Sequence, residues 1–585
     1  MSLAPVLNAA PTLRLVSSAV GPASIAVGSN GPTQLVEAYN AGDGTLTLSQ
    51  VTSSVPWASA TVGAAGPCTT IFTVSTCIPI NVALNTASLK AGMQTGILMV
   101  TAPASVVDAP QTITVTVNMG GAVPSSISVY VAPGGTVDVP TPTNSDLRWR
   151  ATTQDGNNWL SMAISGSGSF KFVYPWSVQV QPASANTPGT YNGTVTLSNS
   201  SFAADNKAIA VTMNVTTQPI AQAPSQVNVT LAAGAPPQTQ YSAIPVTVTN
   251  SGMGALTVTG ATAATSSCGS SWLAVAPTAS GASLSVDPTG MSSGTSCNAT
   301  LTITTNAVNT LPAIPITLQV VAKGAPTVNY QGVLNNATFV PGEAVCPGDI
   351  VVVKGSQFSF GGATTGGYTA GQAPPLATDV GSAQVLVNGT AAPMFYSFYG
   401  QLAFQMPVDA PTGTAVIQVK RDDGAVSNLV SVPVAAMAPR LLLIGVGNYG
   451  AIQNATDNSY PLPAGAFPGL TTHAAHPGDV LVIYAIGLGP TSPAVGTGQP
   501  APSAEPLARL SSPVTVAFAS QAGDILAPAD ATPSFVGQSP GYAGLFQVNV
   551  TVPSNAPTGV INLFLSYPDN SVSNTVQIAV AASGQ

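Results

Sequence analysis

Three short segments centred on tryptophan recur along the first half of this 585-residue chain. Trp57 lies in PWAS, Trp159 in NWLS and Trp272 in SWLA, so successive tryptophans are 102 and 113 residues apart. Each is followed by a turn of small residues and by segments in which Val, Ile or Leu alternates with Thr or Asn, such as QTITVTVNM from Gln111. Strict alternation is typical of antiparallel strands with one buried face. Repeats of about 100 residues with such strands predict tandem immunoglobulin-like β-sandwiches, and the equivalent positions of the three tryptophans predict that each lies in a sandwich core.

A second kind of repeat occupies the rest of the chain. PGDIVVVKG from Pro347 matches PGDVLVIYA from Pro477, and VSNLVSVPV from Val426 matches VSNTVQIAV from Val572. The two offsets, 130 and 146 residues, differ, which indicates insertions in the second copy. We therefore predict an all-β protein with immunoglobulin-like sandwich domains in series. The predicted domains are 1–120, 121–219, 220–323, 324–436 and 437–585.

Charged residues are scarce: the chain has 12 Lys and Arg and 20 Asp and Glu, which together make 5% of its residues. An ordinary globular protein has about 25%. So few cations cannot neutralise a run of phosphates, and this excludes nucleic acid as a partner. Neutral Thr, Ser and Asn occupy the solvent-facing half of most predicted strands, so copies of the chain would repel one another weakly. This composition favours a structural protein whose partners include itself.

Cysteine spacing bears on the compartment. Cys68 and Cys77 bracket a short stretch, Cys268 and Cys297 flank the middle strands of one repeat, and Cys346 is left over. We predict the pairs Cys68–Cys77 and Cys268–Cys297, which indicate an oxidising compartment, while buried thiols in a reduced protein remain the alternative. The state of Cys346 stays open. No apolar run approaches the ~18 residues of a membrane-spanning helix, and MSLAPVLNAAP lacks the features of a signal peptide. We expect an extracellular or cell-surface location.

Three patterns imitate enzyme or metal motifs. The two histidines of the chain, His473 and His476, form HxxHxxD with Asp479, but the PGD turn recurs in the first copy without a histidine, so a turn-capping carboxylate is favoured. The GxGxxG at 445–450 and the GxSxG at 537–541 lack the helix that each site requires. We predict that the protein is not an enzyme and has no cofactor and no metal site.

Two aromatic runs are candidates for a ligand or interface patch. In the segment 394–399 aromatic residues occur at both parities of the alternation, so one strand face cannot bury them all, and packing between domains is the alternative to ligand binding. In 170–176 the aromatic residues share one parity, which favours the core of a sandwich. Trp149, between two arginines, is expected to point inward. The candidate residues are Phe395, Tyr396, Phe398, Tyr399, Tyr174 and Trp176.

The C-terminal half also carries a resemblance. NNATFVPG from Asn335, followed by PGDIVVVKG, VLVNGTAAPMFY, GQLAFQMP and PGDVLVIYAIGLG, resembles an uncharacterised C-terminal module of secreted and surface proteins of acidobacteria. Each half of this segment is also similar to the IPT/TIG fold through its PGD strand and its later SN-x-V. The resemblance implies sandwiches used for contacts, and it implies no catalytic residues.

The tryptophan repeats resemble BACON-type domains, most closely in SWLAVAPTASGASLSVDPTG from Ser271. This resemblance implies either carbohydrate binding or a role as a spacer. We therefore expect a secreted or cell-surface, non-enzymatic structural or adhesion protein. A further form of this hypothesis is that copies of the protein assemble into an extracellular polymer or filament. The alternative is a carbohydrate-binding protein that uses exposed aromatic residues and whose partner is an extracellular glycan.

Overall fold

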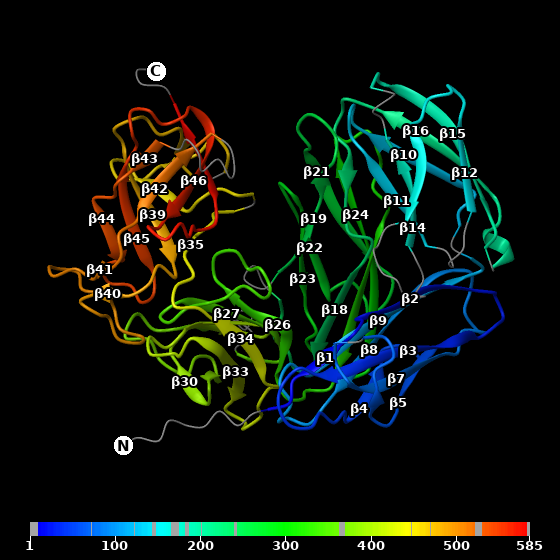
Figure 1. Ribbon diagram of the computed structural model, residues 1–585, viewed down its shortest axis with the longest axis horizontal. Coiled ribbons are helices and arrows are strands. Elements are labelled where there is room, and N and C mark those ends of the chain that lie inside the picture. Colours follow the sequence, from blue (N-terminus) through cyan, green and yellow to red (C-terminus); the bar gives the residue numbers. More distant parts are fainter. Residues whose placement is uncertain are drawn as a thin grey trace. The chain divides into compact units, whose positions relative to one another are not determined.

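A computed structural model describes residues 10–71, 73–121, 123–142, 148–164, 175–181, 186–200, 202–238, 243–361, 369–445, 447–467, 470–520 and 529–581 (Figure 1). The described part is built of β-strands, with the short 3-10 helix η2 (Ala203–Asp205) between two of them. The predicted all-β fold class is confirmed. The chain divides into two compact units. Unit 1 is Met1–Ala233 with Pro237–Ala322, and unit 2 is Lys323–Gln585 with Gly234–Pro236.

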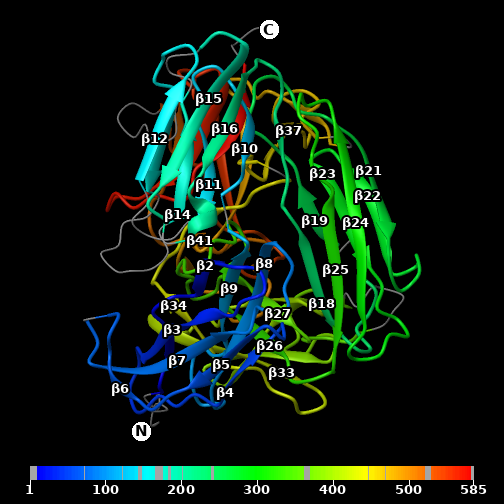
Figure 2. The ribbon, with the colours of Figure 1, turned by 90° about the vertical axis from the view of Figure 1, so that its right-hand side faces the viewer.

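Unit 1 contains three four-stranded sheets of one topology. In each, the strand that comes first in the sequence pairs in parallel with the strand that comes last, and the other neighbours are antiparallel. In the third sheet these two strands, β18 (Val227–Ala232) and β25 (Ile314–Val321), lie side by side in Figure 2. The strands in sheet order are β2 (Ala19–Ile25), β9 (Gln111–Met119), β8 (Gly92–Thr101) and β4 (Gln50–Ser53); β10 (Ser126–Val131), β16 (Ala208–Val215), β15 (Gly189–Ser198) and β12 (Arg148–Thr153); and β18 (Val227–Ala232), β25 (Ile314–Val321), β24 (Ser296–Thr305) and β21 (Val258–Thr265).

A second set of strands accompanies each of these sheets. In the first two repeats, buried side chains from both sheets form one hydrophobic cluster, as in a β-sandwich. The strands are β1 (Leu13–Leu15), β3 (Gly31–Asn40), β7 (Thr76–Leu84) and β5 (Ala58–Val62), with β6 (Gly66–Pro67) also on β7; β11 (Val137–Pro142), β14 (Pro175–Val180) and β13 (Leu160–Ile164); and β19 (Ile244–Thr247), β23 (Gly281–Val286) and β22 (Leu273–Thr278), with β17 (Ala221–Gln222) on β20 (Thr249–Asn250).

The recurring tryptophans lie in the cores of unit 1, as their equivalent positions predict. Trp57, Trp159 and Trp272 are 7%, 0% and 1% exposed. The backbone carbonyl of each accepts an N–H from the residue that follows β7, β14 or β23 of the second set of strands, namely Asn85, Gln181 and Asp287. The sequence repeat is therefore a repeat of both packing and backbone hydrogen bonds.

The expectation that Trp149 points inward is wrong. Its side chain is 40% exposed, and Arg148 and Arg150 on either side of it are exposed as well. Trp149 lies on β12, which is the edge strand of its sheet and has a strand neighbour, β15, on one side only. An edge strand offers less cover to its inward residues than a central strand, so alternation alone did not decide burial here.

Unit 2 contains two copies of a second sandwich. In the first copy, one sheet orders β26 (Thr327–Asn335), β27 (Ile350–Ser356), β32 (Gln401–Gln405), β31 (Met394–Phe398) and β28 (Thr369–Ala370), and the other orders β30 (Thr390–Ala392), β29 (Ala383–Val387), β33 (Gly413–Arg421) and β34 (Val430–Val434). Asn388 and Gly389 connect β29 to β30, both at positive φ (49° and 84°), which is the conformation that a two-residue Asn-Gly hairpin turn requires. The buried side chains of both sheets form one cluster.

The second copy repeats the central pairings of the first. In one sheet, β39 (Val480–Ile486), β45 (Phe546–Thr551) and β44 (Phe535–Gln538) correspond to β27, β32 and β31. In the other, β42 (Thr515–Ala519), β46 (Gly559–Ser566) and β47 (Val576–Val580) correspond to β29, β33 and β34. Its strands are β35 (Arg440–Leu441), β39 (Val480–Ile486), β45 (Phe546–Thr551), β44 (Phe535–Gln538), β41 (Arg509–Leu510) and β40 (Thr491–Ser492), with β36 (Ile452–Asn454) on β39; β43 (Ala529–Ala531), β42 (Thr515–Ala519), β46 (Gly559–Ser566) and β47 (Val576–Val580); and β37 (Tyr460–Pro461) on β38 (Thr472–His473).

The repeated SN-x-V motif has a defined structural role in both copies. The side-chain amide of Asn428 donates to the carbonyl of Val328 (3.0 Å) and accepts from the N–H of the same residue (2.8 Å). Asn574 makes the same two bonds with Leu441, at 3.0 and 2.6 Å. The motif therefore fastens the strand that opens each sandwich to the hairpin that closes it.

Candidate functional site

The structure distributes the aromatic run of β31 over different surroundings. Phe395 packs with Ala337, Ile350 and Ile486 in a cluster that joins the two copies of unit 2. Tyr399, just after β31, is 4% exposed, and its ring meets that of Phe360 edge-on at 5.6 Å. Both residues of the predicted patch therefore pack against other side chains. For Phe395 this is the predicted alternative, packing between domains.

Tyr396 and Phe398 lie on the outward face of β31. Both side chains are half-buried, and their rings stack with centroids 5.8 Å apart and planes 12° from parallel. The register of β31 shifts between Met394 and Tyr396, and this bulge interrupts the alternation at Phe395. Tyr396 and Phe398 therefore lie together on the face that points away from the core, although Met394 points into it. Of the predicted patch at 394–399, Tyr396 and Phe398 are the two aromatic residues available for contact with a ligand.

Polar side chains from the neighbouring strands adjoin the stacked rings. Gln401 on β32 pairs with both Lys354 on β27 and Phe398 on β31 across the sheet. Its amide nitrogen donates to the hydroxyl of Tyr396, and its amide oxygen accepts from the ammonium of Lys354. Lys354 follows Val353, which points into the core, so Lys354 lies on the outward face. The three strands thus present a connected row of rings, amide and ammonium, which we call the Lys354 platform (Lys354, Gln401, Tyr396, Phe398 and Phe339).

Phe339 completes the platform from the connection between β26 and β27. Its side chain is 43% exposed, its backbone has φ +55°, and the Lys354 ammonium lies 5.8 Å from the centre of its ring. Asn335 holds this connection in place, because its side-chain oxygen accepts from the N–H groups of Ala337 (3.0 Å) and Thr338 (2.8 Å). A bulky residue at positive φ is uncommon and costs free energy, so its presence here is a hint of function.

Lys354 differs in its electrostatic surroundings from the cations of unit 2 that form ion pairs. Lys323 and Arg421 both pair with Asp423, at 3.3 and 2.9 Å, Arg440 pairs with Glu343 at 3.3 Å, and Arg509 pairs with Glu505 at 2.9 Å. Among the described residues, no carboxylate lies within ion-pair distance of Lys354, and burial lowers the pKa of its ammonium. Lys354 is therefore a half-buried cation whose contacts are an amide oxygen and an aromatic ring.

The sequence analysis missed Lys354, Gln401 and Phe339. Lys354 and Gln401 are 47 residues apart and meet only through the register of β27 and β32. Phe339 stands alone in the sequence between polar and small residues. A signal was available at Phe339, because an isolated aromatic residue between Thr338 and Val340-Pro341-Gly342 lies in a turn-forming segment and not in a strand.

The other predicted patch falls largely outside the described residues. Tyr174 is not among them. Trp176 lies on β14, where it pairs with Thr141 and Ile164, but its side chain is outside the described part. These two residues remain candidates from the sequence.

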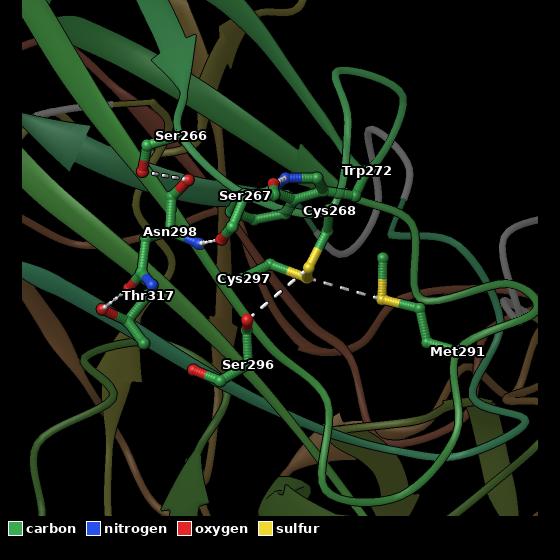
Figure 3. Close-up of a disulfide and its surroundings, with 9 residues drawn as sticks. All are labelled: Ser266, Ser267, Cys268, Trp272, Met291, Ser296, Cys297, Asn298 and Thr317. Atoms are coloured by element: carbon green, nitrogen blue, oxygen red, sulfur yellow. Dashed lines mark hydrogen bonds between the residues drawn. A yellow bond between two sulfur atoms is a disulfide. The ribbon is translucent and has the colours of Figure 1, made fainter.

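Both predicted cysteine pairs are bonded in the structure, Cys68 to Cys77 and Cys268 to Cys297. The second bond ties the turn before Trp272 to the start of β24, close to Met291 and Ser296 (Figure 3). In the same region, the side-chain oxygen of Ser267 accepts from the N–H of Asn298 at 2.7 Å. Cys346 is unpaired and buried, and this burial raises the pKa of its thiol well above its ordinary value.

The enzyme-like and metal-like motifs take ordinary structural positions. His473 contacts Asp457 at 2.8 Å, whereas His476 lies 3.9 Å from Asp479, so the two histidines have different carboxylate partners. No group of three or more His, Cys, Asp or Glu side chains in the described ranges is arranged to hold a metal ion. Ser539 of the GxSxG is 3% exposed, and its hydroxyl lies 3.2 Å from the Gln547 side-chain oxygen.

No protein-family model and no curated protein matches this chain. Solved structures match over long stretches at low identity. An endo-fucoidan hydrolase from glycoside hydrolase family 107 is 15% identical (54% of this chain and 45% of that chain; TM-score 0.17), so the chain spans less than half of that enzyme. The Bacteroides ovatus mixed-linkage glucan utilization locus protein SGBP-B, solved with a mixed-linkage heptasaccharide, is 12% identical (73% and 93%; TM-score 0.21). Immunoglobulin domains 1–4 of Sidekick-1 are 10% identical (79% and 97%; TM-score 0.18). Likenesses at this level identify neither a family nor a function.

No helix of the described residues is long and apolar enough to cross a membrane.

Proposed function

We propose that this protein is a secreted or cell-surface structural and adhesion protein that has no catalytic activity and associates with copies of itself. Two disulfides in a chain with one further cysteine support an oxidising compartment. We further propose that its tryptophan repeats are BACON-like and that unit 2 belongs with the acidobacterial and IPT/TIG-like modules. The SN-x-V bonds shared by both copies of unit 2 support this second assignment.

The observation that carries self-association is the chemistry of the outward sheet faces in unit 1. On β24, five successive outward residues are exposed and uncharged: Ser296, Asn298, Thr300, Thr302 and Thr304. Hydroxyl and amide groups bond across neighbouring strands, as in Thr317 to Asn298 (3.3 Å), Thr212 to Asn192 (3.2 Å) and Thr190 to Asn214 (2.9 Å). Such a face is hydrated without carrying charge, so two copies approach without strong repulsion.

Charge introduced on this face tests the proposal. We expect the wild-type protein to form larger species as its concentration rises in analytical ultracentrifugation, and regular assemblies in electron microscopy. The double variant Thr300→Lys, Thr302→Lys should stay monomeric over the same range, because like charges on facing copies repel. Ser293→Lys, in the exposed turn before β24, is the matched control and should behave as the wild type. A wild-type protein that remains monomeric at the highest concentration would contradict self-association.

A second candidate function is carbohydrate binding. It is favoured by the stacked rings of Tyr396 and Phe398, because the C–H face of a sugar ring complements the electron-rich face of an aromatic ring. A glycan array tests it with the full chain and Tyr396→Ala. Binding that the substitution abolishes supports this function, and the absence of any bound glycan refutes it.

A further inference from the structure

The Lys354 platform combines features that select one class of ligand. It presents stacked rings from β31, an exposed ring from the β26–β27 connection, and between them an amide and an ammonium. Aromatic faces flanking a few convergent polar groups are the usual composition of a small-molecule site. The platform lies on one sheet and on a connection that Asn335 holds in place, so these groups are positioned before a ligand arrives.

The ammonium decides the charge of the ligand. A half-buried cation has lost part of its hydration, and in proteins this cost is usually offset by a paired carboxylate. In unit 2, Lys323, Arg421, Arg440 and Arg509 have such partners. Within the described chain Lys354 and Lys420 do not, but Lys420 is exposed and keeps its hydration, whereas Lys354 is half-buried. The Gln401 oxygen accepts one of its three N–H donors, and the Phe339 ring adds a cation–π contact. Donors therefore remain for an anionic group.

The surroundings of the ammonium exclude other ligand classes. A quaternary ammonium ligand would suit aromatic rings, but it would be repelled by Lys354. A nucleic acid needs a series of cations along its backbone, and in the described strands of this sheet no Lys or Arg accompanies Lys354. A free inorganic anion would use the ammonium but not the rings. A sugar ring that carries an acidic substituent uses both: its C–H face packs against Tyr396 or Phe398, and its anionic group meets the ammonium.

We propose that the Lys354 platform binds an acidic saccharide, with the carboxylate or sulfate of the sugar on Lys354 and the sugar ring on the aromatic side chains of Tyr396, Phe398 and Phe339. This inference rests on carbohydrate binding, the second proposed function, and it is independent of self-association. Gln401 is a positioning residue, since it holds the Tyr396 hydroxyl and the Lys354 ammonium at once.

Matched pairs of polymers provide the test. Polygalacturonate is compared with its fully methyl-esterified form, and dextran sulfate with dextran, by affinity gel electrophoresis and titration calorimetry on the full chain. We expect binding of one or both acidic polymers at least tenfold tighter than binding of its neutral counterpart, weakening as salt is raised. The pair that shows the difference distinguishes carboxylate from sulfate.

Three variants assign the binding to the platform. Lys354→Met keeps the aliphatic stem and removes the charge, so it should reduce affinity for the acidic polymer at least tenfold and leave the neutral polymer unaffected. Phe339→Ala should reduce affinity for the acidic polymer, because its exposed ring is outside the sandwich core. Lys420→Met, which removes an exposed cation from β33 in the opposite sheet, should bind as the wild type.

The outcomes separate this inference from the function on which it rests. Equal binding of acidic and neutral polymers, or equal affinities of Lys354→Met and Lys420→Met, would overturn the acidic ligand while leaving carbohydrate binding in place. No binding of any polymer would overturn both. Hydrogen exchange in peptides of β27 and β32 verifies that each variant is folded, so loss of binding in a folded variant counts for the proposal.

Discussion

The two copies of unit 2 contain the same four-residue turn, at 346–349 and at 476–479, in different surroundings. In each, the glycine at the third position donates its N–H to the backbone carbonyl of the residue that follows the neighbouring strand: Gly348 to Met406 at 3.0 Å and Gly478 to Val552 at 2.9 Å. The aspartate side chain closes the turn in both, since Asp349 accepts from the N–H of Cys346 and Asp479 from that of His476. The backbone is thus the same in both copies.

The surroundings of the two carboxylates are not the same. Asp349 is 0% exposed, whereas the side chain of Asp479 is 27% exposed and accepts a further bond from Asn454 at 2.9 Å. The second copy covers the first turn: a Cβ on Gly544 would lie 2.8 Å from the carbonyl oxygen of Gly348, and Ile350 packs against Ile486. The second turn has no such cover, as Val480 beside it is 36% exposed. One motif therefore gives two environments, according to what packs on it.

The largest expected difference between the turns is in pH dependence. Burial raises the pKa of Asp349 from its ordinary 3.8 to about 7. The folded state then holds a proton that the unfolded state releases, so this contribution to stability is complete below pH 3.8 and is lost as pH rises to about 7. The loss is at most about 4 kcal/mol. We expect protection factors from hydrogen exchange in peptides spanning 346–354 to fall over this pH range.

The second copy and a substitution serve as controls for this prediction. Peptides spanning 476–484 should lack the fall, and Asp349→Asn should remove it from 346–354 while keeping an acceptor for the N–H of Ile350 (3.0 Å). Local exchange is the suitable measurement, because a chain of several sandwiches does not unfold as a two-state system. Parallel pH profiles in both turns would contradict the burial of Asp349 as the cause.

The SN-x-V bonds should matter equally in both copies. Asn428→Ala and Asn574→Ala each remove two hydrogen bonds and leave the N–H of a buried residue, Val328 or Leu441, without its partner. We expect each substitution to lower the local free energy of unfolding of its own copy by about 2–4 kcal/mol, measured by hydrogen exchange. Asn329→Ala, an exposed asparagine on β26, should change it by less than about 0.5 kcal/mol. Unequal effects at Asn428 and Asn574 would show that the copies differ in more than burial.

The glycines of the two turns test whether the backbone is equally demanding. Gly348 and Gly478 have φ of +79° and +97°, and a Cβ would meet only an ordinary contact to Val408 (3.6 Å) at the first and nothing within 4 Å at the second. The cost of Gly→Ala should therefore come from the backbone alone, about 1–2 kcal/mol in each copy. A much larger loss of local stability for Gly348→Ala, measured by hydrogen exchange, would reveal a steric constraint from the second copy.

The smallest expected effect belongs to a histidine that only the second copy contains. The carbonyl of Ala474 and the carboxylate of Asp457 raise the pKa of His473 above its ordinary 6.5. The stabilisation is complete below pH 6.5 and is lost as pH rises through the raised pKa. Both side chains are more than 40% exposed, so solvent screening keeps the effect below about 1 kcal/mol. An NMR titration of the His473 ring checks the direction, and Asp457→Asn should return the pKa toward 6.5.

Much of the fold was predictable because it depends on local pattern. Alternation and turn residues indicated strands throughout, and the equivalent positions of Trp57, Trp159 and Trp272 predicted their burial, which the structure confirms. Alternation failed at Trp149, because β12 is an edge strand and strand position in a sheet is not written in the local pattern. The five predicted domain boundaries stay predictions.

The candidate site was predictable only in part. The excess of aromatic residues in β31 indicated that one strand face could not bury them all. Tyr396 and Phe398 lie on the outward face, Phe395 packs between the two copies, and Tyr399 is buried. Nothing in the sequence near Lys354 distinguishes it as a cation without a carboxylate partner. Whether a cation has a carboxylate partner depends on all the side chains around it in space, and those around Lys354 come from separate strands.

The sequence by itself determined that this chain is a series of sandwiches with nearly uncharged surfaces, since both properties follow from residue order along each strand and from composition. The tertiary structure alone decided which members of repeated motifs are buried. Asp349 and Asp479 occupy identical turns, yet only Asp349 is sealed by the copy that follows it. Burial and electrostatics depend on contacts between segments far apart in the chain, and the free energy of a charge is set by those contacts and not by its own motif.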